Sequence, residues 1–229
     1  MDDIQLTQRS FAVKAQHQPQ HRFSDLYHLL SRADWIEYAL DAVLSNTGSR
    51  TAGVDGITRK DLANETFRQQ FLTELRNDLH TGTYRPQPAR RHWIPKASGG
   101  QRGLGIPTLR DRVVQMLLKM LLEPIFESDF LDCSHGFRPG RRTMDCIAEC
   151  YAHITCLHKY FWIVEGDIRK CFDRINHLIL LRLLERRVAD RRVVALIERF
   201  LQAGLMEDGL FSPTSEGTPQ GAIISPLLT

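Results

Sequence analysis

Several features that define other classes of protein are missing from this sequence of 229 residues. No run of apolar residues approaches the ~18 that a membrane helix requires, and Asp2 and Asp3 put acid where a secretory signal carries base. The five cysteines include no C-x-x-C pair, and neither they nor the nine histidines show metal-ligand spacing, so we predict no disulfide framework and no zinc. We expect a globular, cytoplasmic protein.

Positive charge is modest over the whole chain and concentrated in one region. The formal net charge is only +3. Between Tyr84 and Arg112, however, Asp111 is the lone acid among many basic residues. These basic residues are Arg85, Arg90, Arg91, Lys96, Arg102, Arg110 and Arg112, and Arg138, Arg141 and Arg142 follow. Such a local cluster favours contact with phosphate groups.

Apolar periodicity predicts mostly helices. The polar residues 1–23 show no period, and we expect a flexible arm there. Helices are predicted from residue 24 until Gly82, interrupted by an exposed glycine-containing loop over 46–56. Further helices are predicted over a long buried segment that Thr108 caps and over 143–157, 176–187 and 190–203.

Two segments predict strands instead of helices. Residues 90–107 indicate a basic β-hairpin around a glycine-rich turn. The apolar, β-prone run 160–164 predicts a strand that leads to Asp167. Trp93 and Trp162, which lie in these two segments, are expected in the core.

Asp167 is the first candidate for a metal-binding or catalytic residue. Where a strand ends, a side chain leaves the core and can meet solvent or a bound cation, and Mg²⁺ prefers oxygen ligands. An aspartate at such a position is about as often a helix cap or a turn residue. The neighbouring sequence therefore has to decide between these two roles.

The segment around Asp167, DIRKCFD (167–173), resembles the first palm motif of reverse transcriptases. Four further blocks resemble other motifs of these enzymes and occur in the expected order. They are TAGVDG (51–56), IPK (94–96) with RGLGIPT (102–108), SHGFRPGR (134–141), and TPQG (218–221) with SP (225–226). On these motifs, the chain from about residue 24 to its end is identified as a member of the group II intron-encoded reverse transcriptases, or maturases.

This resemblance implies an α+β fold with the organisation of a right-hand polymerase. Residues 1–23 would be the flexible arm and 24–83 the N-terminal helical extension of the fingers. Residues 84–158 would form the fingers, with the basic β-hairpin, and 159–229 an incomplete palm.

The resemblance also implies a mechanism of phosphoryl transfer assisted by two Mg²⁺ ions, with Mn²⁺ as an alternative. Asp167 would bind the ions through its carboxylate and Ile168 through its backbone carbonyl. Lys96 and Arg102, on the hairpin, would contact the triphosphate of the incoming deoxynucleotide (dNTP), where fixed positive charge matters most.

Other residues would recognise the sugar and the nucleic acids. Phe172 would lie beneath the sugar and collide with a 2′-hydroxyl, so that the product is DNA. Gln220 and Gly221 would approach the nucleotide from the opposite side, since glycine permits close backbone approach. Contacts with RNA phosphates, which fix position without reading sequence, are predicted for Arg85, Arg90, Arg91, Arg138, Arg141 and Arg142.

The sequence departs from the family pattern after the Gln-Gly motif. A complete reverse transcriptase supplies further carboxylates from a Tyr/Phe-x-Asp-Asp turn, and then a thumb. The aspartates after Asp173 are Asp190, at a helix start, and Asp208, in a glycine-flanked turn. Because one carboxylate cannot hold two divalent ions, we expect these residues alone to be inactive.

Three interpretations remain. The chain is the fingers and partial palm of an RNA-directed DNA polymerase, a non-catalytic RNA-binding maturase module that assists intron folding and splicing, or a degenerate remnant. The expected partners are a template or intron RNA and a DNA primer, with no membrane. A downstream polypeptide would complete the palm and thumb, or the open sheet edge would drive self-association.

Overall fold

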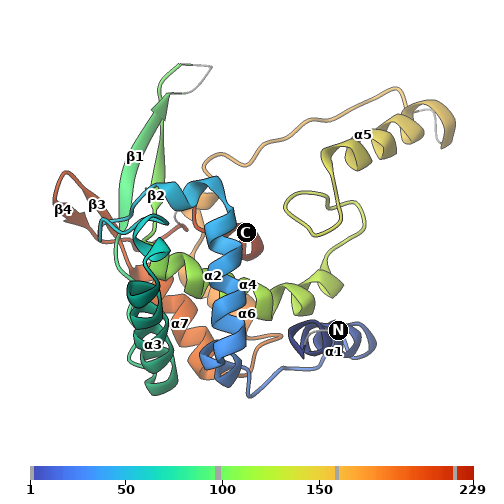
Figure 1. Cartoon of the computed structure of the whole chain (residues 1–229). Helices are drawn as coiled ribbons and strands as arrows, with labels where there is room; N and C mark the ends of the chain where they lie inside the picture. Colours follow the sequence, from blue (N-terminus) through green and yellow to red (C-terminus); the bar gives the residue numbers. More distant parts are fainter. Residues whose placement is uncertain (1–2, 96–98, 158–159, 219–220) are drawn as a thin grey trace.

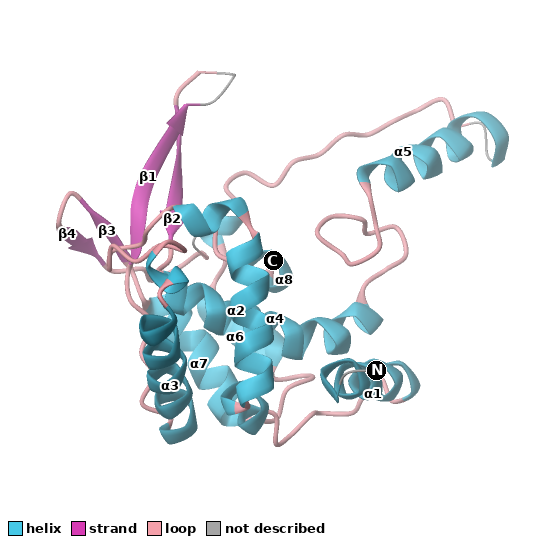
Figure 2. Cartoon of the chain, viewed as in Figure 1, coloured by secondary structure: helices cyan, strands magenta, loops and turns pink. Residues whose placement is uncertain are grey.

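The computed structural model describes residues 3–95, 99–157, 160–218 and 221–229. Within these ranges the fold is α+β, as predicted: helices form the body, and the strands gather at one side of it (Figure 1, Figure 2). The helices are α1 (Asp3–His17), α2 (Ala33–Ser45), α3 (Glu65–Thr81), α4 (Leu109–Phe126), α5 (Thr143–Ala152), α6 (His177–Leu184), α7 (Arg191–Gln202) and α8 (Ser225–Leu228). The strands are β1 (Ala89–Pro95), β2 (Gln101–Ile106), β3 (Leu205–Glu207) and β4 (Leu210–Ser212).

Helix α4 is the centre of the hydrophobic core. Thr108 caps it as expected, since its Oγ1 accepts a hydrogen bond from the N–H of Asp111 at 3.0 Å. Both α1 and α2 pack against α4. Its fully buried side chains include Val113, Val114, Leu117, Leu118, Leu121 and Leu122. Because burying each such side chain is worth about 1.5–3 kcal/mol, α4 holds the surrounding elements in place.

The N-terminal residues correct one prediction. We expected a flexible arm over 1–23, but residues Asp3–His17 form α1, which packs against α4. Ile4, Phe11 and Ala15 are spaced so that they share one helix face, which packs on the core. This apolar stripe is narrow within a polar sequence. The helix therefore depends on contact with α4 rather than on a strong local pattern.

The predicted basic hairpin is present and belongs to a larger sheet. β1 and β2 pair antiparallel, with Arg90 opposite Ile106 and Pro95 opposite Gln101. The sequence did not predict β3 and β4, which extend the sheet in the order β2-β1-β3-β4. β3 runs parallel to β1 and begins with Leu205 opposite Ala89. The base of the hairpin is thus held by residues from far along the chain.

The predicted palm strand over 160–164 is wrong for this structure. The segment is irregular and has no strand partner among the described residues. Phe161, Trp162 and Val164 are 91%, 92% and 97% exposed, and Trp93 is 45% exposed, so neither tryptophan lies in the core. A β-prone run becomes a strand only where a neighbouring strand supplies hydrogen bonds. The sequence shows the β-propensity of the segment but not whether a partner strand lies beside it.

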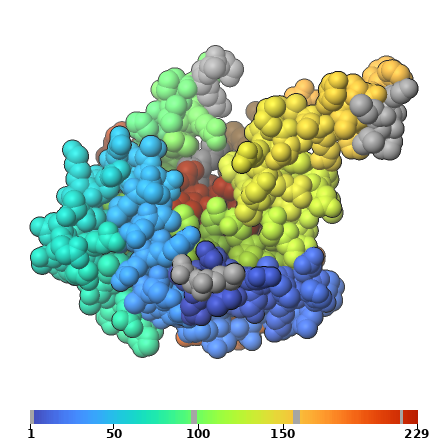
Figure 3. Space-filling model, turned by 45° about the vertical axis from the view of Figure 1, so that its right-hand side comes forward, coloured from blue at the N-terminus to red at the C-terminus, as the bar shows by residue number. Residues whose placement is uncertain are grey.

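The helices predicted in the second half of the chain are confirmed. α5 continues into a π-helical turn (His153–Leu157). Asn176 caps α6 and Asp190 caps α7. The hairpin stands apart from α5, and the C-terminal residues lie at the base of the hollow between them (Figure 3). No helix of the described ranges is long and apolar enough to cross a membrane.

Candidate active site

Four parts of the chain line a cleft of about 830 Å³. The β1–β2 hairpin contributes one side with Arg91, Trp93 and Arg102, and the loop 167–174 contributes another. Leu205 of β3 and residues within 214–218 line the rest. Ligand sites in proteins typically measure about 300–1,000 Å³, so this cleft has the size of a small-molecule site.

The cleft brings together predicted site residues that are far apart in the sequence. Asp167, Ile168 and Phe172 line it together with Arg102 of the hairpin. Asp167 is exposed and Phe172 is half-buried. The family motifs implied this arrangement, in which an acid faces a cationic hairpin.

Two predicted site residues lie outside the described part of the chain. Lys96 falls within 96–98 and Gln220 within 219–220. Gly221 is described, and its backbone adopts a φ of +107°, which favours glycine. A Cβ at this position would lie 3.0 Å from the carbonyl oxygen of Gly105 in β2. Gly221 therefore permits a close approach to the base of the hairpin.

Charges of both signs face the cleft. The basic side chains are Arg91, Arg102, Lys170 and Arg174, and the acidic ones are Asp167, Asp173 and Glu216. The guanidinium of Arg91 lies 5.3 Å from the centroid of the Trp93 ring. A Cβ on Gly103 would lie 2.6 Å from Arg91 Nη1, so the glycine leaves room for this arginine across the hairpin. The hairpin side of the cleft can thus attract an anionic ligand.

The described residues supply only part of a two-metal site. Asp167 offers a carboxylate and Ile168 a backbone carbonyl, both of the oxygen type that Mg²⁺ prefers. No group of three or more His, Cys, Asp or Glu side chains converges within the described ranges. Two metal ions need more ligands than these two. The described residues therefore do not form a complete two-metal site.

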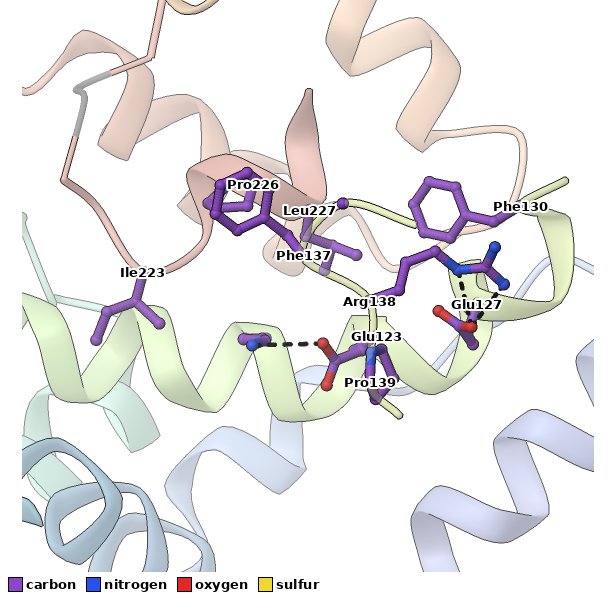
Figure 4. Close-up of a pocket in the computed structure, with 11 residues that line it drawn as sticks. Glu123, Glu127, Phe130, Phe137, Arg138, Pro139, Ile223, Pro226 and Leu227 are labelled. Atoms are coloured by element: carbon purple, nitrogen blue, oxygen red, sulfur yellow. Dashed lines mark hydrogen bonds and ion pairs between the residues drawn. The ribbon is translucent and has the colours of Figure 1, made fainter. Parts of the chain in front are cut away.

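Arg138 does not have the position expected of an RNA contact. It is 9% exposed, and its guanidinium donates to Glu127 Oε1 and to the carbonyl oxygens of Leu131 and Ser134, each at 2.7 Å at its shortest. Figure 4 shows Arg138 directed at Glu127, beside a small pocket of about 70 Å³ that Phe137 and Pro226 also line. Arg138 thus joins the 130–140 loop to Glu127, directly after α4, and its guanidinium is not available to a phosphate.

Arg90 is also engaged within the protein. Its Nη2 and Nε donate to the carbonyl oxygen of Ala52 at 2.8 and 3.1 Å. This bond ties β1 to the TAGVDG block (51–56). Unlike Arg138, Arg90 is only half-buried, and these bonds use two of its five N–H donors. Its contact with an RNA phosphate therefore stays a prediction.

The other four arginines predicted to contact RNA remain at the surface or in the cleft. Arg85 is exposed and donates to the carbonyl oxygen of Tyr84 at 3.0 Å. Arg141 pairs with Asp132, an exposed acid, at 3.2 Å. Arg142 is exposed at the start of α5, and Arg91 lines the cleft. Exposed ion pairs are weak, so a phosphate can compete for these side chains.

Arg112 has a structural role that the sequence did not reveal. It is 8% exposed, and its guanidinium donates to the carbonyl oxygens of Pro107, Gly48 and Thr51 at 2.9, 2.7 and 2.8 Å. Burial lowers the pKa of this guanidinium, although the nearby Asp55 opposes the shift. Its sequence signal was only a basic residue in a basic region. Together with Arg90, it fixes the loop at 48–52 against the base of the hairpin.

Comparisons with known proteins agree with these motifs. The family described as reverse transcriptase (RNA-dependent DNA polymerase) matches residues 94–229. Protein YkfC of Escherichia coli is 40% identical over 228 residues, which cover 97% of this chain and 58% of YkfC. The group II intron-encoded protein LtrA of Lactococcus lactis is 38% identical over 211 residues, or 90% of this chain and 33% of LtrA. Nuclear intron maturase 1 of Arabidopsis thaliana is 38% identical over 96 residues, or 42% of this chain and 13% of the maturase.

These matches cover most of this chain but only part of its relatives. The chain spans less than two thirds of YkfC and of LtrA. The family match covers more than half of the chain and contains Arg102, Asp167 and Phe172, which line the cleft. The chain belongs to the reverse transcriptase (RNA-dependent DNA polymerase) family, and its relatives identify it with the group II intron-encoded members of that family.

Proposed function

We propose that this chain forms the fingers and part of the palm of an RNA-directed DNA polymerase encoded by a group II intron. The complete enzyme extends a DNA primer on an RNA template. The observation that carries this proposal is the cleft of about 830 Å³ that Asp167, Phe172 and Arg102 line together. An acid, an aromatic ring and a cation around one cleft match the needs of metal, sugar and triphosphate recognition.

The roles of the individual residues follow from their chemistry. Asp167 and the carbonyl oxygen of Ile168 contribute ligands for Mg²⁺ or Mn²⁺, and bound metal would stabilise the charge that develops on the transferred phosphate. Arg102 and Lys96 bind the triphosphate of the dNTP. Phe172 limits the space at the sugar.

The remaining surface residues are assigned to nucleic acid. Gln220 and Gly221 contact the nucleotide, and Gly221 lies beside the base of the hairpin. Arg85, Arg90, Arg91, Arg141 and Arg142 contact phosphates of the template or intron RNA, and such contacts weaken as salt rises.

The domain boundaries are part of the same proposal, with one change. Residues 24–83 are the N-terminal extension of the fingers, 84–158 the fingers and 159–229 the partial palm. α1 joins the fingers rather than forming an arm, because it packs on α4. The exposed segment 160–164 is the place where a further polypeptide supplies the strands that complete the palm sheet. We place the protein in the cytoplasm, together with its RNA.

Primer extension on an RNA template tests the polymerase function. The chain alone is expected to make no DNA, because it holds too few metal ligands. The chain joined to a downstream polypeptide that carries an Asp-Asp turn and a thumb is expected to extend the primer. Asp167→Asn in this completed enzyme should lower synthesis by about a hundredfold or more while RNA binding persists. Glu37→Gln, at an exposed position of α2, serves as the matched control.

Two outcomes would favour other functions. If the completed enzyme makes no DNA but the chain binds intron RNA tightly and raises splicing, the non-catalytic maturase function is correct, as the similarity to a nuclear intron maturase suggests. If neither synthesis nor RNA binding occurs, the chain is a remnant. Equal loss of RNA binding and synthesis in Asp167→Asn would contradict the metal role of Asp167.

A further inference from the structure

Two of the segments that line the cleft are joined to each other by hydrogen bonds through Gly217. The N–H of Gly217 donates to the carbonyl oxygen of Ile175 at 2.8 Å, and the N–H of Thr218 donates to the carbonyl oxygen of Phe172 at 2.7 Å. The ring of His177 donates from Nε2 to the carbonyl oxygen of Gly217 at 2.7 Å. Both backbone polar groups of Gly217 are therefore bound to the 172–177 segment.

This contact requires glycine at position 217. Its φ is +82°, which L side chains rarely adopt. A Cβ on Gly217 would lie 2.7 Å from the carbonyl oxygen of Asp173 and 2.8 Å from that of Phe172. The two chain segments approach so closely that any side chain would force them apart.

His177 is well placed to hold this contact because it belongs to a rigid element. It is the first residue of α6, and the preceding Asn176 caps that helix by accepting a hydrogen bond from the N–H of Ile179 at 3.0 Å. The His177 side chain is half-buried and does not line the cleft. Its partner Gly217 does line the cleft, as does the next residue, Thr218, which is 4% exposed.

We propose that His177 is a positioning residue that locks the 214–218 segment to the Phe172 loop. Through Gly217 it holds Thr218, and with it the start of the Gln-Gly motif, at a fixed distance from the ring of Phe172. The 214–218 segment and the Phe172 loop, which form two sides of the cleft, then move together when a nucleotide binds. The contact itself is a property of this chain, whereas its consequence for nucleotide selection rests on the proposed polymerase function.

Amide hydrogen exchange on the full chain tests the contact directly. His177→Phe keeps a ring of similar volume but removes the donor, and His177→Gln keeps a donor at similar reach. In His177→Phe the amides of Gly217 and Thr218 should exchange about fivefold faster, the factor that corresponds to the ~1 kcal/mol of a typical hydrogen bond. In His177→Gln their exchange should stay close to that of the wild type. Amides of α4, which lies outside the contact, serve as the internal control.

Either of two results would overturn the proposal. Unchanged exchange at Gly217 and Thr218 in His177→Phe would mean that the ring does not hold the segment. Equal acceleration in the Gln and Phe variants would mean that ring packing, and not the hydrogen bond, is responsible. Gly217→Ala provides a second approach, because the added methyl group should accelerate exchange at Thr218 even with His177 intact.

Kinetics in the completed enzyme test the functional consequence. His177→Phe should raise the KM for dNTP about fivefold and weaken discrimination against ribonucleotides, and His177→Gln should restore both. A KM and a discrimination ratio that do not change would overturn the positioning role. If the wild-type completed enzyme makes no DNA at all, the polymerase proposal fails, while the exchange experiment still decides whether His177 holds the contact.

Discussion

Asp190 connects two distant parts of the chain through a single carboxylate. Its Oδ2 accepts hydrogen bonds from the N–H groups of Leu26 and Tyr27, each at 2.8 Å, and its Oδ1 accepts one from the N–H of Arg192 at 3.0 Å. Burial by itself raises the pKa of this carboxyl. The three N–H donors and the charge of Arg192 outweigh burial, so the pKa lies below its ordinary value.

We predict that Asp190→Asn lowers the free energy of unfolding by about 2–3 kcal/mol at neutral pH, because it weakens charge-assisted bonds and the cap of α7. A carboxyl group whose pKa is lower in the folded protein stabilises the fold fully at pH values above its pKa in the unfolded chain. This stabilisation is lost as the pH falls through the pKa of the folded protein. The difference between wild type and variant should therefore be complete above about pH 5 and shrink below about pH 4. Urea unfolding at several pH values measures it, and a difference that does not vary with pH would contradict the role of the charge.

Phe172 is the residue that we expect to select the sugar. It is half-buried and lines the cleft beside Asp173 and Lys170. In the completed enzyme, Phe172→Ala should raise incorporation of ribonucleotides relative to deoxynucleotides by about tenfold or more, since relief of one steric conflict is worth about 1–3 kcal/mol. Tyr38→Ala, at a 53% exposed position of α2 outside the cleft, is the control. Equal sugar discrimination in Phe172→Ala and wild type would remove this assignment.

Among the secondary-structure elements, the hairpin has the most direct functional prediction. Arg102 lies in β2 and faces the cleft, whereas Arg85 lies on the surface before β1. Arg102→Glu should raise the KM for dNTP by about ten- to a hundredfold, the range for loss of a charged hydrogen bond, with a smaller effect on RNA affinity. Arg85→Glu should do the reverse. If both variants weaken RNA binding and leave the KM unchanged, the hairpin contacts the template instead.

The contribution of helix α1 to the stability of the fold can be tested by deletion. Ile4 and Ala15 are 7% and 1% exposed because α1 covers part of α4. Deletion of residues 1–17 should lower the free energy of unfolding by about 2–4 kcal/mol, since it uncovers apolar side chains of α4. Leu6→Ser, at a position of α1 that is 50% exposed, should change little. Unaltered stability after the deletion would show that α1 does not stabilise the fold in solution.

At the scale of the whole molecule, many large apolar side chains on two segments are exposed. Phe161, Trp162 and Val164 are 91%, 92% and 97% exposed, and Met144 and Tyr151 on α5 are 68% and 65% exposed. Soluble monomers rarely expose neighbouring large apolar side chains to this extent. The surface fits a protein that is completed by further polypeptide or associates with itself.

We therefore predict that the isolated chain self-associates in a concentration-dependent way, which light scattering measures. The double variant Phe161→Ser, Trp162→Ser should shift the association to clearly higher concentration. Leu131→Ser, which replaces a 72% exposed leucine in another loop, should not. A monodisperse monomer for the wild-type chain at high concentration would contradict this prediction.

The sequence predicted this molecule well where structure depends on neighbouring residues. The hairpin over 90–107, the caps at Thr108, Asn176 and Asp190 and the helices after residue 143 are all confirmed. Each depends on spacing or on side chains within a few positions. Family membership also followed from short motifs, because such motifs preserve their residue order whatever surrounds them.

Contacts between distant segments were beyond the reach of the sequence. It did not predict α1, because that helix depends on α4, and it overpredicted the strand at 160–164, because propensity alone does not supply a partner strand. It assigned Arg138 to RNA, although folding buries its guanidinium against Glu127 and two carbonyl oxygens within the protein.

The sequence by itself thus determined which chemical groups this protein carries and in which order, since residue identity and local spacing need no tertiary context. Only the tertiary structure decided which of these groups meet. Asp167, Arg102 and Phe172 line one cleft, whereas Arg138 is buried. The physical reason is that burial and hydrogen bonding depend on partners that come together only when the chain folds.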